Sequence, residues 1–226
     1  MFWLVPRPQG HHAPQNGSPR MFRVEWIERY LSRVKPWHVL VVWVPAVAYL
    51  VYRGLQVPDV SVAAFAGSLL GGLAFWTLLE YVLHRWVFHF TPSPNSQFAQ
   101  DVHFLIHGVH HDWPHDADRL VMPPVLSALL AILLGYPMFL VLGPRFFDPF
   151  FAGLVTGYIW YDMTHYAVHH LKPRTEAGAK LRKHHYLHHF KTPEARYGVS
   201  TPLWDFVFGT MPREERPSAG VTGAGH

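Results

Sequence analysis

The 226-residue sequence predicts an all-α integral-membrane protein with four transmembrane helices. Half of its residues are apolar and only 15% are charged, whereas an ordinary soluble domain carries roughly a quarter charged residues. The sequence also contains 18 histidines, most of them between His38 and His189, and no cysteine. Without cysteine, disulfides, thiolate metal sites and a cysteine nucleophile are excluded. A bound metal would therefore have to be held by nitrogen or oxygen.

The two ends of the chain differ from its middle. Residues 1–20, which include His11 and His12, are rich in Pro, Gly and polar residues, and this composition predicts a disordered tail. Residues 211–226 are expected to form a second such tail. Residues 21–36 are predicted to form an amphipathic helix in the membrane interface, because apolar residues recur there at helical spacing between charged ones. Packing of this helix against the rest of the protein is the alternative.

Four long apolar stretches dominate residues 37–210, which we expect to form the membrane domain. The predicted spans are residues 37–57, 60–83, 125–142 and 146–168. About 20 residues cross the hydrocarbon layer, so each stretch is long enough to do so. A soluble core of buried helices is the alternative, but four such lengths are hard to bury in a chain of this size.

The distribution of Lys and Arg predicts the orientation of the spans. Seventeen of these residues precede the first span, separate the second from the third, or follow the fourth, whereas Arg53 and Arg145 lie on the other side. Because positive residues favour the cytoplasm, both termini and the middle segment are expected there. The net charge of +4 does not indicate nucleic-acid binding, since the basic residues form no stripe with interleaved aromatics.

Ten histidines fall in four short motifs that this topology places on one side of the membrane. The motifs are HRWVFH, HGVHH, HYAVH and HYLHH, and their histidines are His84, His89, His107, His110, His111, His165, His169, His185, His188 and His189. Residues three and four apart share a helix face, so each HxxHH motif presents three imidazoles to one side. His84 and His89 are five apart and converge only if the helix loosens there or if each faces a different ion.

Ten imidazoles suit two five- or six-coordinate metal ions with room for water or oxygen. Neutral imidazole is a good ligand for iron, zinc, copper and nickel. Because the bonding nitrogen must be deprotonated, binding is expected to weaken as the pH falls toward the unperturbed histidine pKa of about 6.5. A lone histidine at the end of a membrane helix is usually structural, but two HxxHH units with two further pairs are hard to explain in that way.

Several other side chains are candidates for supporting roles. Those expected to hold the metal ligands through hydrogen bonds are Asp162, Asp116, His103 and Glu80. Candidate substrate-binding residues are Trp86, Trp160, Tyr161 and Trp204, although interfacial aromatics are the alternative for these. His115, His170 and His184 flank the ligand motifs, while His38 and His226 are expected to be structural or inert.

The motifs together resemble the fatty acid hydroxylase superfamily, and within it the fatty acid 2-hydroxylases. The similar stretches are LEYVLHRWVFHF, HFLIHGVHHDWPHDADRLVMPP, GYIWYDMTHYAVHH, HHYLHHF and YGVSTPLWDFVFGT, within residues 75–210. The resemblance implies four membrane helices under a cytosolic helical cap, a dinuclear site held by the ten histidines, and O2 as oxidant. Zinc is found bound in some members, but zinc has no redox chemistry, so iron is the expected catalytic metal.

The resemblance also implies an external electron donor. The first 36 residues are too few for the cytochrome b5 domain that many eukaryotic relatives carry. A separate partner, such as cytochrome b5 or a ferredoxin with its reductase, is therefore expected.

The expected function is that of a membrane-bound di-metal oxygenase that hydroxylates a fatty-acyl chain near its carboxyl end, at position 2. A metal site at the cytosolic interface would meet the first carbons of a lipid, since mid-chain carbons lie about 10 Å deeper in a hydrocarbon core of roughly 30 Å. A sterol or carotenoid hydroxylase or desaturase of the same superfamily is the alternative. Outside the oxygenases, a membrane metal transporter or a metal-dependent hydrolase remains open.

Overall fold

The computed structural model describes Leu4 and residues 17–212, and every regular element within these residues is a helix. The rest of the two tails predicted for residues 1–20 and 211–226, with His11, His12 and His226, lies outside the described residues. Three of the described helices are long and apolar enough to cross a membrane. They are α2 (Pro36–Leu55), α3 (Val62–Val82) with the π-helical turn η2 (Leu83–Phe88), and α6 (Pro124–His170).

Helices α2 and α3 form a hairpin around the predicted turn. Pro36 opens α2, where its fixed φ suits the first helical turn. The chain turns at Asp59, whose φ of 58° is positive. Ser61 then caps α3, because its hydroxyl accepts a hydrogen bond from the Ala64 backbone N–H at 3.2 Å. The first two predicted spans thus match α2 and α3 closely.

Helix α6 is a hairpin of two helical arms rather than one straight rod. Gly143 has φ 65° and ψ 174°, a conformation outside the helical region that favours glycine. The arms pack antiparallel about this residue: the rings of Phe139 and Phe147 meet at 5.4 Å, and Gly135 lies against the Phe151 ring. The stretches predicted at 125–142 and 146–168 correspond to these two arms.

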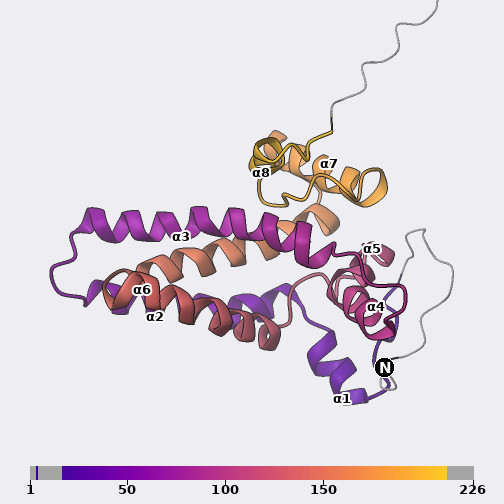
Figure 1. Cartoon of the computed structure of the whole chain (residues 1–226), viewed down its shortest axis with the longest axis horizontal. Coiled ribbons are helices and arrows are strands. Elements are labelled where there is room, and N and C mark those ends of the chain that lie inside the picture. Colours follow the sequence, from indigo (N-terminus) through magenta and orange to yellow (C-terminus); the bar gives the residue numbers. More distant parts are fainter. Residues whose placement is uncertain (1–3, 5–16, 213–226) are drawn as a thin grey trace, which may run out of the picture.

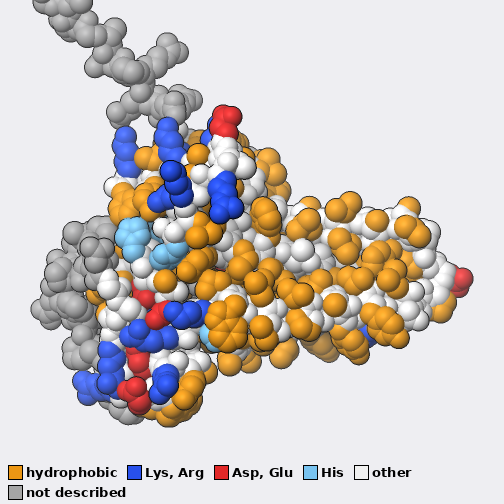
Figure 2. Space-filling view, turned by 180° about the vertical axis from the view of Figure 1, so that it is seen from behind, with side chains coloured by type: hydrophobic (Ala, Val, Ile, Leu, Met, Phe, Trp, Pro, Cys, Tyr) orange, Lys and Arg blue, Asp and Glu red, His pale blue; other side chains and the backbone are white. Residues whose placement is uncertain are grey.

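The second arm of α6 crosses α3 at close range. At Gly153 a side chain would collide with the backbone carbonyl of Leu69, so only glycine lets the two helices approach this far. The apolar core lies among α2, α3 and α6 and includes Trp43, Trp76 and Tyr158. Large apolar side chains on the outer faces of these helices are exposed, as expected for surfaces that meet lipid (Figure 2).

The shorter helices gather at one end of the long ones (Figure 1). They are α1 (Glu25–Ile27) with the turn η1 (Glu28–Ser32), α4 (Gln97–His103), the turn η3 (Phe104–Gly108), α5 (Val109–Asp112), α7 (Glu176–Phe190) and α8 (Leu203–Val207). We call this part of the molecule the cap. Lys and Arg side chains are concentrated on it, whereas the long helices present a mostly apolar surface (Figure 2).

The helix predicted over residues 21–36 is shorter in the structure, where it covers only residues 25–32. The charged residue Glu28 lies within this segment and is buried. Its carboxylate accepts hydrogen bonds from the backbone N–H groups of Met21 and Phe22 at 3.0 and 3.1 Å, and it pairs with Arg33 and Arg119. These contacts fold residues 21–22 back onto the helix instead of extending it.

Candidate metal centre

The ten motif histidines converge at the cap end of the long helices in two groups of five. Group 1 contains His84, His89, His107, His111 and His188. Group 2 contains His110, His165, His169, His185 and His189. Within each group, one potential ligand atom per residue lies within 4.8 Å of all the others, a spacing that could hold one metal ion.

The turn η2 brings together the two histidines that are five residues apart. A π-helical turn pairs residues i and i+5, and here the His89 N–H donates to the His84 carbonyl at 3.1 Å. The two ring centroids are consequently only 5.0 Å apart. Of the two arrangements that the HRWVFH spacing allowed, the structure shows the loosened helix, with both histidines in group 1.

Each HxxHH motif supplies both groups. His107 and His111 point into group 1 and His110 into group 2, while His188 belongs to group 1 and His185 and His189 to group 2. The groups are adjacent: the rings of His111 and His189, one from each group, stack at 4.3 Å. The sequence predicted three imidazoles on one side of each motif, and the structure divides them between two neighbouring centres.

The nitrogen spacing within the groups fits metal coordination better than hydrogen bonding. Neighbouring Nε2 atoms lie 2.9–3.1 Å apart. With metal–nitrogen bonds of about 2.1 Å, ligands at right angles are about 3.0 Å apart and ligands at the tetrahedral angle about 3.4 Å. The spacing therefore matches a five- or six-coordinate ion.

The contacts of His185 also favour metal coordination over hydrogen bonding. Its Nε2 lies 2.9–3.0 Å from the Nε2 atoms of His165, His169 and His189. An imidazole nitrogen offers either one lone pair or one N–H, so it cannot form hydrogen bonds with three neighbours at once. A shared cation would satisfy all four lone pairs.

Two rings of group 1 are oriented by backbone carbonyls. His84 Nδ1 lies 2.5 Å from the Tyr197 carbonyl oxygen, and His188 Nδ1 lies 2.7 Å from that of Ala195. Because a carbonyl can only accept, Nδ1 carries the proton in both rings. The Nε2 lone pairs are then free to face a metal, the usual arrangement for histidine ligands.

The loop that carries these carbonyls is held by two buried carboxylates. Glu80, on α3, accepts hydrogen bonds from the Val199 and Ser200 N–H groups at 3.0 and 2.8 Å. Asp205, on α8, accepts from the Tyr197 and Gly198 N–H groups at 2.8 and 2.9 Å. Glu80 thus supports group 1 through the loop and does not touch a ligand ring directly.

The role of Asp205 was not anticipated from the sequence. It is completely buried and also contacts His184 Nε2 at 3.1 Å and the Thr210 hydroxyl at 2.7 Å. Burial alone would raise the pKa of this carboxyl, but its four hydrogen-bond partners outweigh burial and hold the pKa below its usual value. Its position in the stretch YGVSTPLWDFVFGT was the available signal. His184, which flanks a ligand motif, is its partner.

Burial favours the neutral form of the group 1 and group 2 imidazoles that lie outside the long helices. It lowers the pKa of His89 to about 3, and the nearby imidazole of His188 adds to this effect. Burial lowers the pKa of His188 to about 4. The pKa values of His107, His110, His185 and His189 are likewise depressed by burial and by neighbouring rings. At neutral pH each of these rings is therefore uncharged, and one of its two ring nitrogens has a lone pair available for a metal ion.

The other predicted supporting residues lie around the centre in different ways. Asp162 is buried and accepts a hydrogen bond from the Met122 N–H at 3.4 Å, whereas the adjacent His165 Nδ1 has no hydrogen-bond partner among the described residues. Asp116 pairs with Arg119 at 2.8 Å and fixes its own loop. His103 packs against Phe90, with ring centroids 5.2 Å apart.

The four candidate substrate-binding aromatics do not form one pocket. Tyr161 is buried, with its ring 5.7 Å from that of His165. Trp204 donates from its indole N–H to the Thr77 hydroxyl at 3.0 Å. Trp86 and Trp160 are exposed on the outer surface. Of the four, Tyr161 lies against a group 2 ring.

Comparison with known proteins identifies the family of this chain. The sequence model of the family described as fatty acid hydroxylase matches residues 69–210. A dihydroceramide fatty acyl 2-hydroxylase of Arabidopsis thaliana is 38% identical, over 86% of this chain and 81% of that protein. A fatty acid 2-hydroxylase of Mus musculus is 36% identical, over 91% of this chain and 60% of the mouse protein.

A solved structure has the same fold. It is full-length scs7p, of which only the hydroxylase domain is visible, and it aligns with a TM-score of 0.79 at 37% identity, over 85% of this chain and 72% of that one. The chain belongs to the fatty acid hydroxylase family.

Proposed function

We propose that this protein is a membrane-bound fatty-acyl 2-hydroxylase with a dinuclear centre held by the ten histidines of groups 1 and 2. The observation that carries the proposal is the convergence of ten imidazoles in two groups with ligand-like spacing. The similar proteins of Arabidopsis thaliana and Mus musculus are both named as acyl 2-hydroxylases. Each group would hold one ion, and iron is the metal that suits an oxidation.

The reaction requires a metal because no side-chain acid or nucleophile attacks an unactivated C–H bond. Bound iron would supply the redox chemistry with O2. One oxygen atom enters the C–H bond at carbon 2 of the acyl chain and the other leaves as water, which consumes two electrons and two protons. The chain's own contribution is to hold the ligands in position and to exclude water around them.

The electrons come from a separate donor in this proposal. Imidazole ligands do not supply electrons, and cytochrome b5 or a ferredoxin with its reductase provides them one at a time. The donor would approach the cap, since the histidine groups lie there.

The membrane arrangement proposed here has four crossings: α2, α3 and the two arms of α6. The described Lys and Arg residues support a cytoplasmic cap, because they lie mainly there (Figure 2). Arg53 and Arg145 lie at the opposite end, where Arg53 pairs with Asp148 at 3.2 Å and Arg145 donates to the Asp59 carbonyl. Helix α1 and the turn η1, with exposed Trp26 and Tyr30, would rest in the interface.

The position of the centre favours oxidation near the polar end of a lipid. His84 and His165 lie near the cap ends of α3 and α6, so a lipid whose headgroup lies at that interface presents its first carbons there. Tyr161, beside His165, is the proposed substrate contact nearest the centre, and Trp86, Trp160 and Trp204 would meet the lipid farther out. The similarity to acyl 2-hydroxylases favours an acyl chain over a sterol or carotenoid.

A labelling experiment tests this function. The full chain, purified anaerobically and loaded with iron, is given a lipid-bound acyl chain, a chemical reductant with a donor protein, and 18O2. We expect mass spectrometry to find one 18O atom at carbon 2 and no product without O2. Release of the free acyl chain from its lipid in the absence of oxygen, with no hydroxylation, would indicate a hydrolase. Label on an added sterol instead of the acyl chain would overturn the substrate assignment.

A further inference from the structure

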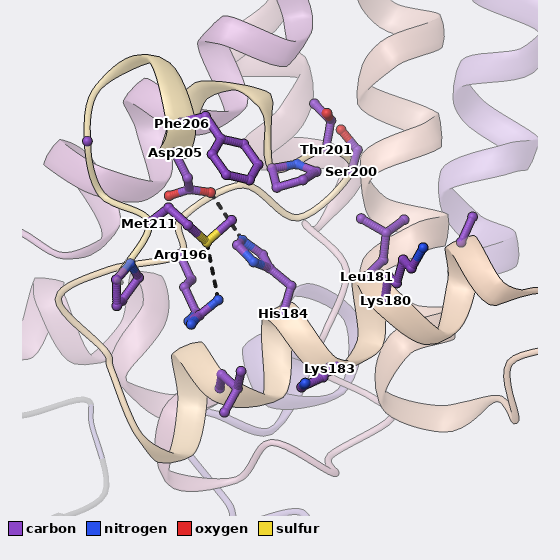
Figure 3. A pocket seen from close by; sticks show the side chains of 15 residues that line it. Lys180, Leu181, Lys183, His184, Arg196, Ser200, Thr201, Asp205, Phe206 and Met211 are labelled. Atoms are coloured by element: carbon purple, nitrogen blue, oxygen red, sulfur yellow. Dashed lines mark hydrogen bonds and ion pairs between the residues drawn. The ribbon is translucent and has the colours of Figure 1, made fainter. Parts of the chain in front are cut away.

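A cavity of about 870 Å³ lies in the cap between α7 and the segment that contains α8 (Figure 3). None of the ten group 1 and group 2 histidines lines it. One wall is the face of α7 that carries Lys180, Lys183 and His184, and the opposite wall carries Arg196 and Phe206. The cavity is therefore separate from the centre described above and needs its own explanation.

The polar part of the cavity is cationic. Lys183 and Arg196 have no carboxylate partner within the part of the chain that the structure describes, and Arg196 contacts only the Met211 sulfur, at 3.2 Å, through its guanidinium. The buried Arg196 Nε has no hydrogen-bond partner there either. Lys180 pairs with Glu176 at 2.7 Å, but both side chains are largely exposed, so this pair is weak.

Few carboxylates line the cavity that could pair with Lys183 and Arg196 in place of a bound anion. Among the described residues that line the cavity, Asp205 is the single carboxylate. It is fully buried and already accepts from His184, Thr210 and two backbone N–H groups. A phosphate would suit Arg196, because a guanidinium can bind two phosphate oxygens at once.

The apolar side of the cavity leads to the surface of α8. Leu203, Phe206, Val207 and Phe208 are between 44% and 65% exposed, although they are large apolar side chains. Such a contiguous apolar surface beside a membrane helix marks contact with lipid or another apolar partner. Phe206 both lines the cavity and belongs to this exposed surface.

Helix α8 lies beside the membrane-spanning part of α3. The Trp204 indole N–H donates to the Thr77 hydroxyl at 3.0 Å, and the rings of Tyr81 and Phe208 stack at 5.2 Å. From Val62 to Thr77, α3 rises about 22 Å, which is within a hydrocarbon core of about 30 Å. The exposed face of α8 is thus at the depth where acyl chains begin.

We propose that this cavity binds the phosphate headgroup of an anionic membrane phospholipid through Lys183 and Arg196, with the lipid's acyl chains lying over α8. The negative cytoplasmic leaflet supplies such lipids. An acidic protein is the less suitable partner, because the cations flank a cavity that continues into an apolar surface. The proposal rests on the membrane placement given above but not on the metal chemistry.

Native mass spectrometry of the iron-loaded full chain tests the proposal. The protein, in a neutral detergent, is titrated with phosphatidylglycerol or with phosphatidylcholine of the same acyl chains. We expect one phosphatidylglycerol to be retained at least tenfold more tightly than phosphatidylcholine. Equal retention of the two lipids would overturn the proposal.

Matched charge reversals locate the site. Lys183→Glu should weaken phosphatidylglycerol binding about tenfold or more. Lys172→Glu, an exposed lysine that does not line the cavity, should change it less than twofold. An equal loss of phosphatidylglycerol binding in both variants would mean that the lipid is attracted by the overall positive charge of the surface, and it would overturn the proposed site.

Two further readouts separate the remaining outcomes. Inorganic phosphate should not raise the thermal unfolding temperature as phosphatidylglycerol does, because it cannot use the apolar surface of α8. Equal stabilisation would indicate a simple anion site and contradict the lipid. Lys183→Glu should retain two irons and its hydroxylase activity. Absence of iron and of hydroxylation from the unsubstituted chain would mean that the proposed function fails, while the comparison of phosphatidylglycerol with phosphatidylcholine would still decide the lipid site.

Discussion

The two histidine groups differ in what holds their rings. In group 1, His84 and His188 donate from Nδ1 to carbonyls of a loop that is itself held by buried carboxylates. In group 2, the buried Nδ1 atoms of His165, His169, His185 and His189 have no hydrogen-bond partner among the described residues. Group 1 therefore depends on a polar scaffold that reaches from α3 to α8, whereas group 2 depends on the packing of α5, α6 and α7 and of their rings.

Removing one ligand from each group should have the largest effect. His110→Ala in group 2 and His188→Ala in group 1 should each lower the metal content from two ions to one and reduce hydroxylation by more than about a thousandfold, since the reaction needs both ions. Metal analysis and product assays measure this. His38→Ala, outside both groups, is the control and should change neither. Full activity in either ligand variant would remove that residue from the centre.

Loss of the scaffold should weaken group 1 selectively. In Asp205→Ala, two backbone N–H groups and His184 lose their acceptor, so the loop that orients His84 and His188 is freed. Removing such ligand-supporting contacts typically costs about 10–100-fold in metal affinity. Competitive chelator titration should find one weakened site and one unchanged site. Asp118→Asn, in a partly exposed ion pair with Lys35, is the control. Equal weakening of both sites would contradict the comparison.

Acid should release both metals only well below neutral pH. Burial lowers the pKa values of His188 and His89 to about 4 and about 3, and it lowers that of His185 well below its usual value. Protons therefore compete for these ligands only below about pH 5, instead of near the unperturbed pKa of about 6.5. Metal content measured from pH 7 to pH 4 checks this. Half-release of both ions at pH 6.5 would argue against buried ligands.

The metal-free protein should lose stability over the same range. The unfolded chain binds protons at histidine below about pH 6.5, while the folded chain does not do so until about pH 4. The unfolded state thus holds more protons between these values, and stability rises with pH in this window and is lost as the pH falls. Thermal unfolding of the metal-free protein at pH 7 and pH 5 measures the difference. An unchanged unfolding temperature would contradict the burial of these rings.

Glu80→Gln should have the smallest effect. The amide oxygen can still accept from the Val199 and Ser200 N–H groups, and the amide N–H can donate to the Ser200 hydroxyl. We expect the free energy of unfolding to fall by about 1 kcal/mol, the difference between a charge-assisted and a neutral hydrogen bond, and group 1 affinity to fall a fewfold. Chemical denaturation measures this. A loss of group 1 metal affinity as large as that expected for Asp205→Ala would mean that Glu80 contributes more than its hydrogen bonds to the loop.

The sequence predicted that the ten histidines come together but not that they divide into two groups. Spacing identified the candidates, because local helix geometry decides which residues share a face. Their division into two groups depends on how α5, α6 and α7 are placed in space, which local spacing does not contain. The role of Asp205 was not predicted for a similar reason. Its partners are backbone groups of the preceding loop and a histidine 21 residues away, and local spacing indicates neither contact. The burial of Glu28 against Arg119 was likewise not predictable, because its partner lies 91 residues away in the sequence.

The bounds of the long helices were predictable from the apolar stretches almost to the residue, because a long apolar run indicates a continuous helix of the same length. The sequence separated the stretches at 125–142 and 146–168, and the structure places the turn between them at Gly143, which has a positive φ. The loops and short helices of the cap were less predictable, because the contacts that fix them join residues such as Glu80 and Ser200, 120 positions apart.

The most direct test of the central claim is X-ray absorption spectroscopy on the iron-loaded full chain together with its metal stoichiometry. The account predicts two irons per chain, each with about five imidazole nitrogens at about 2.1 Å, because each group offers five histidines. One iron per chain, or a coordination shell dominated by oxygen with only one or two imidazoles, would contradict it.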